Sequence, residues 1–150
     1  MNNVFYVDPV EEAKKYGINV YADTDFSKLN HGESGMIEKD GDNITIYVDP
    51  NDSLERQRFT TAHELGHYVS GHLDDNTKML RDSTKSYSQN NYDFKEYEAN
   101  NYAANLLMPK DKLEFLLNNE GLNTVEDLAY ALVVSPQAMR IRLKNLGWIS

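Results

Sequence analysis

The chain has 150 residues, of which 40 % are hydrophobic, and its formal net charge at pH 7 is −9. This length suffices for one compact domain with its own core, so we expect a single domain over residues 1–150. The acidic excess disfavours a nucleic-acid or anionic-membrane binder and favours a basic protein partner. The absence of cysteine excludes disulfides and every metal site built on thiolates.

The first seventeen residues, MNNVFYVDPVEEAKKYG, lack the basic segment and apolar core of a secretory signal. No apolar run approaches the length needed to cross a bilayer. We therefore expect a cytoplasmic protein without a membrane partner.

The first predicted elements are a short helix and a strand. Asp8 and Pro9 predict the start of a helix that reaches Tyr16, and Gly17 predicts its end. The apolar stretch 18–21 that follows predicts a strand.

A β-hairpin is predicted next. The stretches 34–38 and 43–48 flank Lys39-Asp40-Gly41-Asp42, a glycine-containing turn. The second strand leads directly into the next helix. Two roles remain open for it: it offers a free edge to an extended peptide substrate, or it only covers the helix.

The most informative stretch is Arg58 to His72, RFTTAHELGHYVSGH. It has the apolar spacing of an amphipathic helix, and Asp52 followed by Glu55 resembles a helix start. Within it, His63 and His67 are four residues apart, so both imidazoles share one helix face and can bind one ion. Glu64 would stand beside that ion as a general base, which is the HExxH pattern of zinc hydrolases.

A polar stretch from Leu73 to Asp93 comes next and predicts a long loop that is either functional or mobile. His72 and Asp74 are close enough in sequence to be alternative third ligands. A metzincin has glycine at position 70 and histidine at position 73, but this chain has Ser70 and Leu73. We therefore expect His72 to be a surface residue or a support for the metal ligands.

The third ligand is expected from a helix over about 94–107. Glu96 lies three residues before Ala99 and seven before Ala103, so it shares their inward face, whereas Glu98 is turned from Glu96 by about 200°. An inward carboxylate is costly unless it is paired or binds a metal. Glu96 is thus the predicted ligand, and Glu98 is the alternative.

Two further features of this helix concern its neighbour. Asn100 lies one turn after Glu96 and would hydrogen-bond a ligand imidazole and fix its orientation. The small side chains of Ala99, Ala103 and Ala104, together with Gly66, predict a close approach of the two helices.

These motifs together resemble a known family. The stretch RFTTAHELGHYVSGH, the Glu-x-x-Ala segment and the helix ending in Ala-x-Leu-Leu-Met-Pro are similar to the ImmA/IrrE metallopeptidases, a branch of the zincin-like fold, over about residues 10–146. The resemblance implies His63, His67 and Glu96 as ligands of one Zn²⁺ per chain, with Glu64 as catalytic base. It also implies an α+β fold in which a small antiparallel sheet packs on the HExxH helix and C-terminal helices come after it.

Family members typically cleave a helix-turn-helix transcriptional repressor in bacteria, phages or mobile elements, relieving repression after a signal. The resemblance therefore implies a zinc-dependent endopeptidase with such a repressor as substrate. This chain departs from the family pattern at Tyr102, where phenylalanine is common, and it is shorter than members with large C-terminal extensions.

The segment 110–150 is predicted to be helical. Pro109 and Asp111 begin a helix that stops near Gly121, Thr124 caps a helix over 125–132, and Ser135-Pro136 begins the last helix, which Gly147 closes. The short turn at 133–135 gives the last two helices a helix-turn-helix-like corner.

Two alternative functions remain. Arg140, Arg142 and Lys144 on the last helix would suit DNA, but the acidic chain favours packing or repressor docking over direct DNA binding. The other is a non-catalytic, zinc-stabilised anti-repressor that acts by docking alone. The residue that would stabilise an oxyanion is not identified, because any of ten tyrosines can supply the donor.

Overall fold

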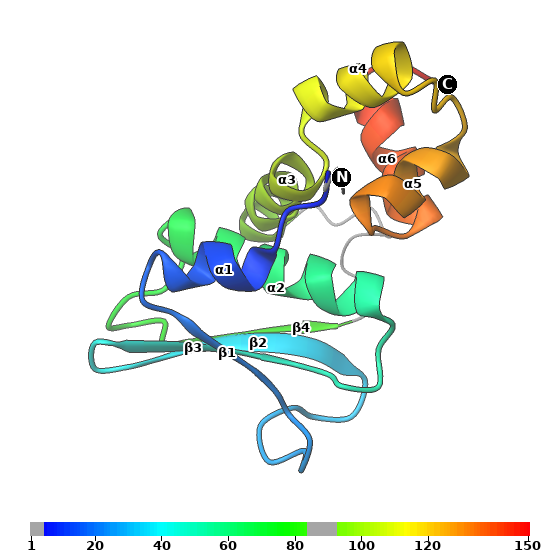
Figure 1. Cartoon of the computed structure of the whole chain (residues 1–150). Helices are drawn as coiled ribbons and strands as arrows, with labels where there is room; N and C mark the ends of the chain where they lie inside the picture. The colour runs from blue at the N-terminus through cyan, green and yellow to red at the C-terminus, as the bar shows by residue number, and fades with distance from the viewer. Residues whose placement is uncertain (1–4, 84–92) are drawn as a thin grey trace.

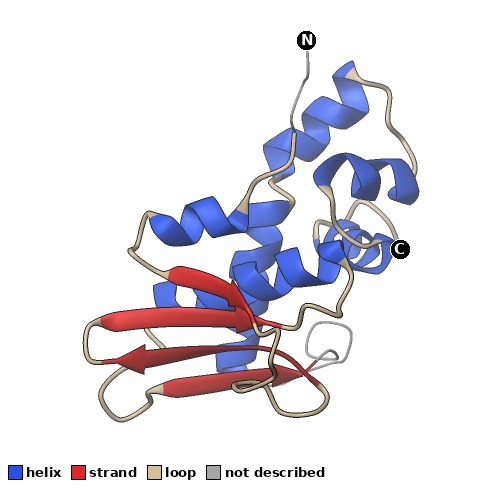
Figure 2. Cartoon of the chain, turned by 60° about the horizontal axis from the view of Figure 1, so that its bottom comes forward, coloured by secondary structure: helices blue, strands red, loops and turns tan. Residues whose placement is uncertain are grey.

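A computed structural model describes residues 5–83 and 93–150. Helices and strands both occur in it, so the α+β prediction is confirmed (Figures 1 and 2). The elements in chain order are α1 (Pro9–Lys14), β1 (Asn19–Ala22), β2 (Glu33–Asp40), β3 (Asn43–Val48), α2 (Leu54–Val69), β4 (Met79–Ser83), α3 (Phe94–Leu107), α4 (Lys110–Asn119), α5 (Val125–Leu132) and α6 (Pro136–Asn145).

The helix starts reflect capping chemistry. Asp8 caps α1 by accepting a hydrogen bond from Val10 N. The cap of α2 is Ser53, whose hydroxyl accepts from Arg56 N, rather than the expected Asp52. The predicted cap lies one residue before the observed one. Serine and aspartate are both strong N-cap residues, and the backbone conformation determines which of two adjacent candidates caps the helix.

The sheet has the strand order β1-β3-β2-β4. β2 and β3 form the predicted antiparallel hairpin, with Gly41 at a φ of 61° in its turn. The sheet is nevertheless mixed rather than antiparallel, because β1 pairs parallel to β3 on the side away from β2. This pairing places β3 inside the sheet, so of the two roles left open for it the free edge is ruled out; the edge strands are β1 and β4.

β4 lies within the stretch 73–93 that was predicted to be a loop. It pairs antiparallel with β2, and this pairing overrides the polar composition of the segment. The rest of the expected loop, residues 84–92, lies outside the described residues.

Helix α2 runs across one face of the sheet, with α1 beside it, and α3 packs against α2 (Figure 1). It touches two hydrophobic cores. Leu65 belongs to the core between α2, α1 and the sheet, whereas Phe59 and Ala62 belong to the core shared with α3 and the C-terminal helices. Its position between the two cores keeps nearly all of its second half buried.

The predicted close approach of α2 and α3 is present. A Cβ atom added to Gly66 would lie 2.8 Å from the carbonyl oxygen of Ala99 and 3.1 Å from Tyr102 Cβ. Backbone therefore meets backbone at this crossing, which only a glycine permits.

The C-terminal helices begin at the predicted caps, Thr124 and Ser135. Between them Val133 adopts a left-handed φ of 54°. Arg142, one of the three basic residues proposed for DNA, is 7 % exposed, and its Nε donates to Met108 O at 3.0 Å. Its guanidinium thus holds α6 against the end of α3 and does not face solvent. None of the helices in residues 5–83 and 93–150 combines the length and the apolar composition that a membrane span requires.

Candidate metal centre

His63 and His67 project from the same face of α2, and both are buried. Their Nε2 atoms lie 2.9 Å and 3.2 Å from the two carboxylate oxygens of Glu96 on α3. The structure therefore brings together the three side chains proposed as ligands. Glu96 reaches the histidines because the close crossing at Gly66 brings the two helices together one turn away.

A fourth donor, Asp82, joins this group from β4. Its Oδ1 lies 3.0 Å from His63 Nε2, and its Oδ2 lies 3.5 Å from His67 Nε2. The sequence reasoning missed this residue because it assigned the segment to a loop. The only local signal is the apolar pair Met79-Leu80 shortly before it in a polar stretch, and strand pairing, not spacing, brings Asp82 to the site.

The four side chains can hold a metal ion: their donor atoms all lie within 4.8 Å of one another. Buried atoms at this point lack hydrogen-bond partners within the described structure, namely His63 Nε2, His67 Nε2, Glu96 Oε2, both oxygens of Asp82 and both oxygens of Glu64. Burying so many polar atoms without hydrogen-bond partners costs free energy unless a bound cation interacts with them. Donors bound at about 2.0 Å around a tetrahedral ion lie about 3.3 Å apart, close to the separations seen here, so imidazole and carboxylate donors fit zinc.

Asn100 makes the hydrogen bond to an imidazole that the sequence predicted. Its Oδ1 accepts a hydrogen bond from His63 Nδ1 at 2.7 Å. Because an amide oxygen can only accept, the ring proton is placed on Nδ1, and the lone pair of Nε2 points at the metal centre.

His72 and Glu98 orient the second imidazole. His72 Nε2 lies 2.9 Å from Glu98 Oε1, and His72 Nδ1 lies 2.8 Å from His67 Nδ1. A neutral His72 that donates to the carboxylate has an acceptor at Nδ1, so His67 donates to it and keeps its Nε2 lone pair for the metal. His72 is therefore a buried support and not a surface residue.

The two other candidate ligands lie outside the group. Glu98 points away from the inward face of α3 that carries Glu96, and its carboxylate contacts His72 instead. Asp74 is exposed and accepts hydrogen bonds from Asn76 N and Thr77 N in a turn.

Glu64 is fully buried beside the same point, with its side chain toward β2. A Cβ atom on Gly35 of β2 would lie 3.3 Å from Glu64 Oε2 and would also collide with Thr60 Cγ2. Burial, and secondly the neighbouring carboxylate of Asp82, raise the pKa of Glu64 well above its usual range. A nearby cation would lower this pKa. The two opposing effects would allow the Glu64 carboxyl to accept a proton and also to donate one.

The electrostatic environment favours a cation. Burial lowers the pKa of His63, but the adjacent carboxylates of Asp82 and Glu96 outweigh this effect and raise it to about 9. The same negative charges raise the pKa of His67, again against the effect of burial. Positive charge is therefore stabilised where the two Nε2 atoms point.

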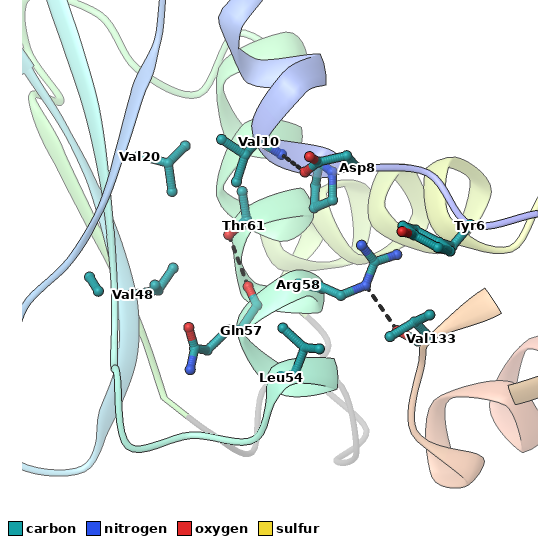
Figure 3. A pocket seen from close by; sticks show the side chains of 12 residues that line it. Tyr6, Asp8, Val10, Val20, Val48, Leu54, Gln57, Arg58, Thr61 and Val133 are labelled. Atoms are coloured by element: carbon teal, nitrogen blue, oxygen red, sulfur yellow. Dashed lines mark hydrogen bonds between the residues drawn. The ribbon is translucent and has the colours of Figure 1, made fainter. Parts of the chain in front are cut away.

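A separate pocket of about 520 Å³ lies on another face of α2, lined by its residues Leu54, Gln57, Arg58 and Thr61 together with α1, β1 and β3 (Figure 3). Its polar groups are already engaged: Arg58 Nε donates to Val133 O at 3.0 Å, and Thr61 donates to Gln57 O at 2.9 Å. This pocket does not include His63 or His67.

Comparison with known proteins agrees with this geometry. No curated protein gives a significant match. The model of the peptidase M78 family, described as the IrrE N-terminal-like domain, matches residues 13–144, which include all four donor residues. The chain therefore belongs to the peptidase M78 family, the family of IrrE N-terminal-like domains.

Proposed function

We propose that this protein is a zinc-dependent endopeptidase, with His63, His67 and Glu96 as metal ligands and Glu64 as general base. One observation carries the proposal: two imidazoles and the Glu96 carboxylate converge within the reach of one ion, with Glu64 buried beside them. Membership of a peptidase family supports it independently.

A zinc ion held there would supply Lewis acidity to a water molecule and to the scissile carbonyl. Glu64 accepts the proton of the attacking water and delivers it to the leaving amine nitrogen. Asn100 and the His72–Glu98 pair hold the two imidazoles in the orientation that would present both Nε2 atoms to the ion.

Replacing Glu64 tests the base. We expect Glu64→Gln to keep about one equivalent of zinc and to lose at least about a hundredfold in cleavage rate, because the amide cannot accept the proton. Zinc content and cleavage would be measured together, with Glu114→Gln on the exposed side of α4 as the control. Undiminished cleavage by the Glu64 variant would refute the mechanism.

Replacing Glu96 tests the third ligand. We expect Glu96→Ala to lose bound zinc in competition with a chelator, since the two imidazoles alone make an incomplete site. The matched variant is Glu98→Ala on the same helix, which removes only a partner of His72. If the Glu96 variant kept its zinc and the Glu98 variant lost it, the two roles would be reversed.

For the substrate we propose a helix-turn-helix transcriptional repressor, cleaved so that repression is relieved. The resemblance to ImmA/IrrE proteins and the net charge of −9, which favours a basic partner, support this substrate class. The test is to incubate the zinc-loaded protein with the repressor encoded nearest to it and to locate the cut by mass spectrometry. An intact repressor under these conditions would contradict this substrate.

A second candidate is a non-catalytic anti-repressor stabilised by zinc. One observation favours it: with Asp82 the centre has four protein donors, and closed four-ligand sites are typical of structural zinc. This candidate predicts that Glu64→Gln remains active in a derepression assay, whereas the endopeptidase predicts that it fails.

A further inference from the structure

Asp82 enters the metal centre from an edge strand. Within the described residues β4 pairs only with β2, and the pairing is irregular at this point: Gly35 pairs with Asp82 and Glu33 with Ser83, so Ser34 of β2 is an extra residue. Asp82 lies two residues after Leu80 on β4, so it shares the side on which Leu80 packs against the core that contains Leu65 of α2, and its side chain is 3 % exposed.

The carboxylate of Asp82 completes a four-donor set. It faces both Nε2 atoms at 3.0 Å and 3.5 Å, and among the described residues no hydrogen bond engages its oxygens. A hydrolytic zinc site needs three protein ligands and one position open to water. In the described arrangement Asp82 would fill that position.

Asp82 is also the donor with the least support. His63 is held by Asn100 and His67 by His72, and both histidines lie on a helix between two cores. Glu96 lies on α3, which packs closely on α2. Among the described residues no hydrogen bond from outside the site engages Asp82, whose carboxylate neighbours Glu64 as well as the two histidines, and its strand has one unpaired side. Turning this one short side chain away would open the site without disturbing the other ligands.

We propose that Asp82 is a displaceable fourth ligand, which closes the metal centre in the resting protein and withdraws when a substrate carbonyl or water takes its place. The proposal rests on the metal ligation assigned under the proposed function. It assigns the edge strand β4 a regulatory role, because whatever moves Asp82 sets the fraction of molecules that can bind substrate.

The probe is acetohydroxamate, a small chelating anion that binds zinc only where a coordination position is free. If Asp82 occupies that position about nine-tenths of the time, Asp82→Ala should tighten acetohydroxamate binding to the zinc-loaded protein about tenfold. Asp82→Asn, which keeps the shape but weakens the ligand, should tighten it in the same direction. The control is Asp42→Asn in the exposed hairpin turn, which should match the unaltered protein.

Zinc affinity, measured by chelator competition, provides the second readout. Both Asp82 variants should retain zinc under conditions in which Glu96→Ala loses it. Equal acetohydroxamate affinity in the unaltered protein and both Asp82 variants would overturn the proposal, as would loss of zinc from Asp82→Asn as complete as that from Glu96→Ala. If the Asp82 variants gain acetohydroxamate affinity but cleave no repressor, the fourth-ligand role stands and only the proposed substrate fails.

Discussion

At the scale of single residues, neighbouring side chains fix the orientation of the proposed ligand imidazoles. His72 contacts His67 on one side and Glu98 on the other, at 2.8 Å and 2.9 Å. A carboxylate behind a histidine fixes the tautomer and makes the ligand nitrogen more basic. In the proposed zinc site His72 would therefore act through His67, as a positioning residue.

Replacing His72 by phenylalanine should weaken zinc binding by about 10- to 100-fold, because His67 Nδ1 loses its acceptor. Glu98→Gln should weaken it less, since the amide oxygen still accepts from His72. The measurement is chelator competition, with His31→Phe at an exposed histidine as the control. Zinc affinity unchanged in the His72 variant would show that the relay does not support the ligand.

At the scale of elements, the site depends on how closely α2 and α3 cross. Gly66 lies one residue before His67, and its missing side chain leaves room for the backbone of Ala99, three residues after Glu96. The two imidazoles can reach the carboxylate only while this crossing stays tight. The packing of α2 on α3 and the geometry of the proposed metal site therefore both depend on Gly66.

Replacing Gly66 by valine should separate the helices. The added atoms meet backbone at 2.8 Å, which no side-chain rotation relieves. We expect destabilisation of about 1–3 kcal/mol from overpacking and a loss of zinc affinity. Denaturant unfolding and zinc titration would measure the two effects, with Gly121→Ala outside this crossing as a control for zinc affinity. Normal zinc affinity in the Gly66→Val variant would show that zinc binding does not depend on the close approach of α2 and α3.

At the scale of the whole molecule, the metal centre joins three separate parts of the chain: α2, β4 and α3. An ion bound there would connect the sheet to the helical layer, and it would neutralise carboxylates that otherwise repel one another across the site. Binding to the folded state alone stabilises that state by mass action.

Removing the metal should therefore lower the melting temperature. At a free zinc concentration about 1,000 times the dissociation constant, the stabilisation is about 4 kcal/mol. For a domain of this size that corresponds to a shift of about 10 °C. Calorimetry with and without a chelator measures it, and Glu96→Ala should respond little to the chelator. A chelator-insensitive melting temperature in the unaltered protein would argue against the metal.

The sequence by itself determined the features that local periodicity controls. The period of 3.6 residues placed His63 and His67 on one helix face and put Glu96, rather than Glu98, on the inward side of the next helix. The cap residues located most helix starts, and the turn at Gly41 located the hairpin. Each of these features depends on residues close together in the chain, so spacing alone reveals it.

Only the tertiary structure decided the rest. Asp82 reaches the histidines because β4 pairs with β2, and neither the parallel β1–β3 pair nor that pairing leaves a local pattern. His72 and Glu98 are 26 residues apart in sequence and meet only because α3 packs on α2. Contacts of this kind arise from which surfaces bury one another, and burial is a property of the assembled fold rather than of any one segment.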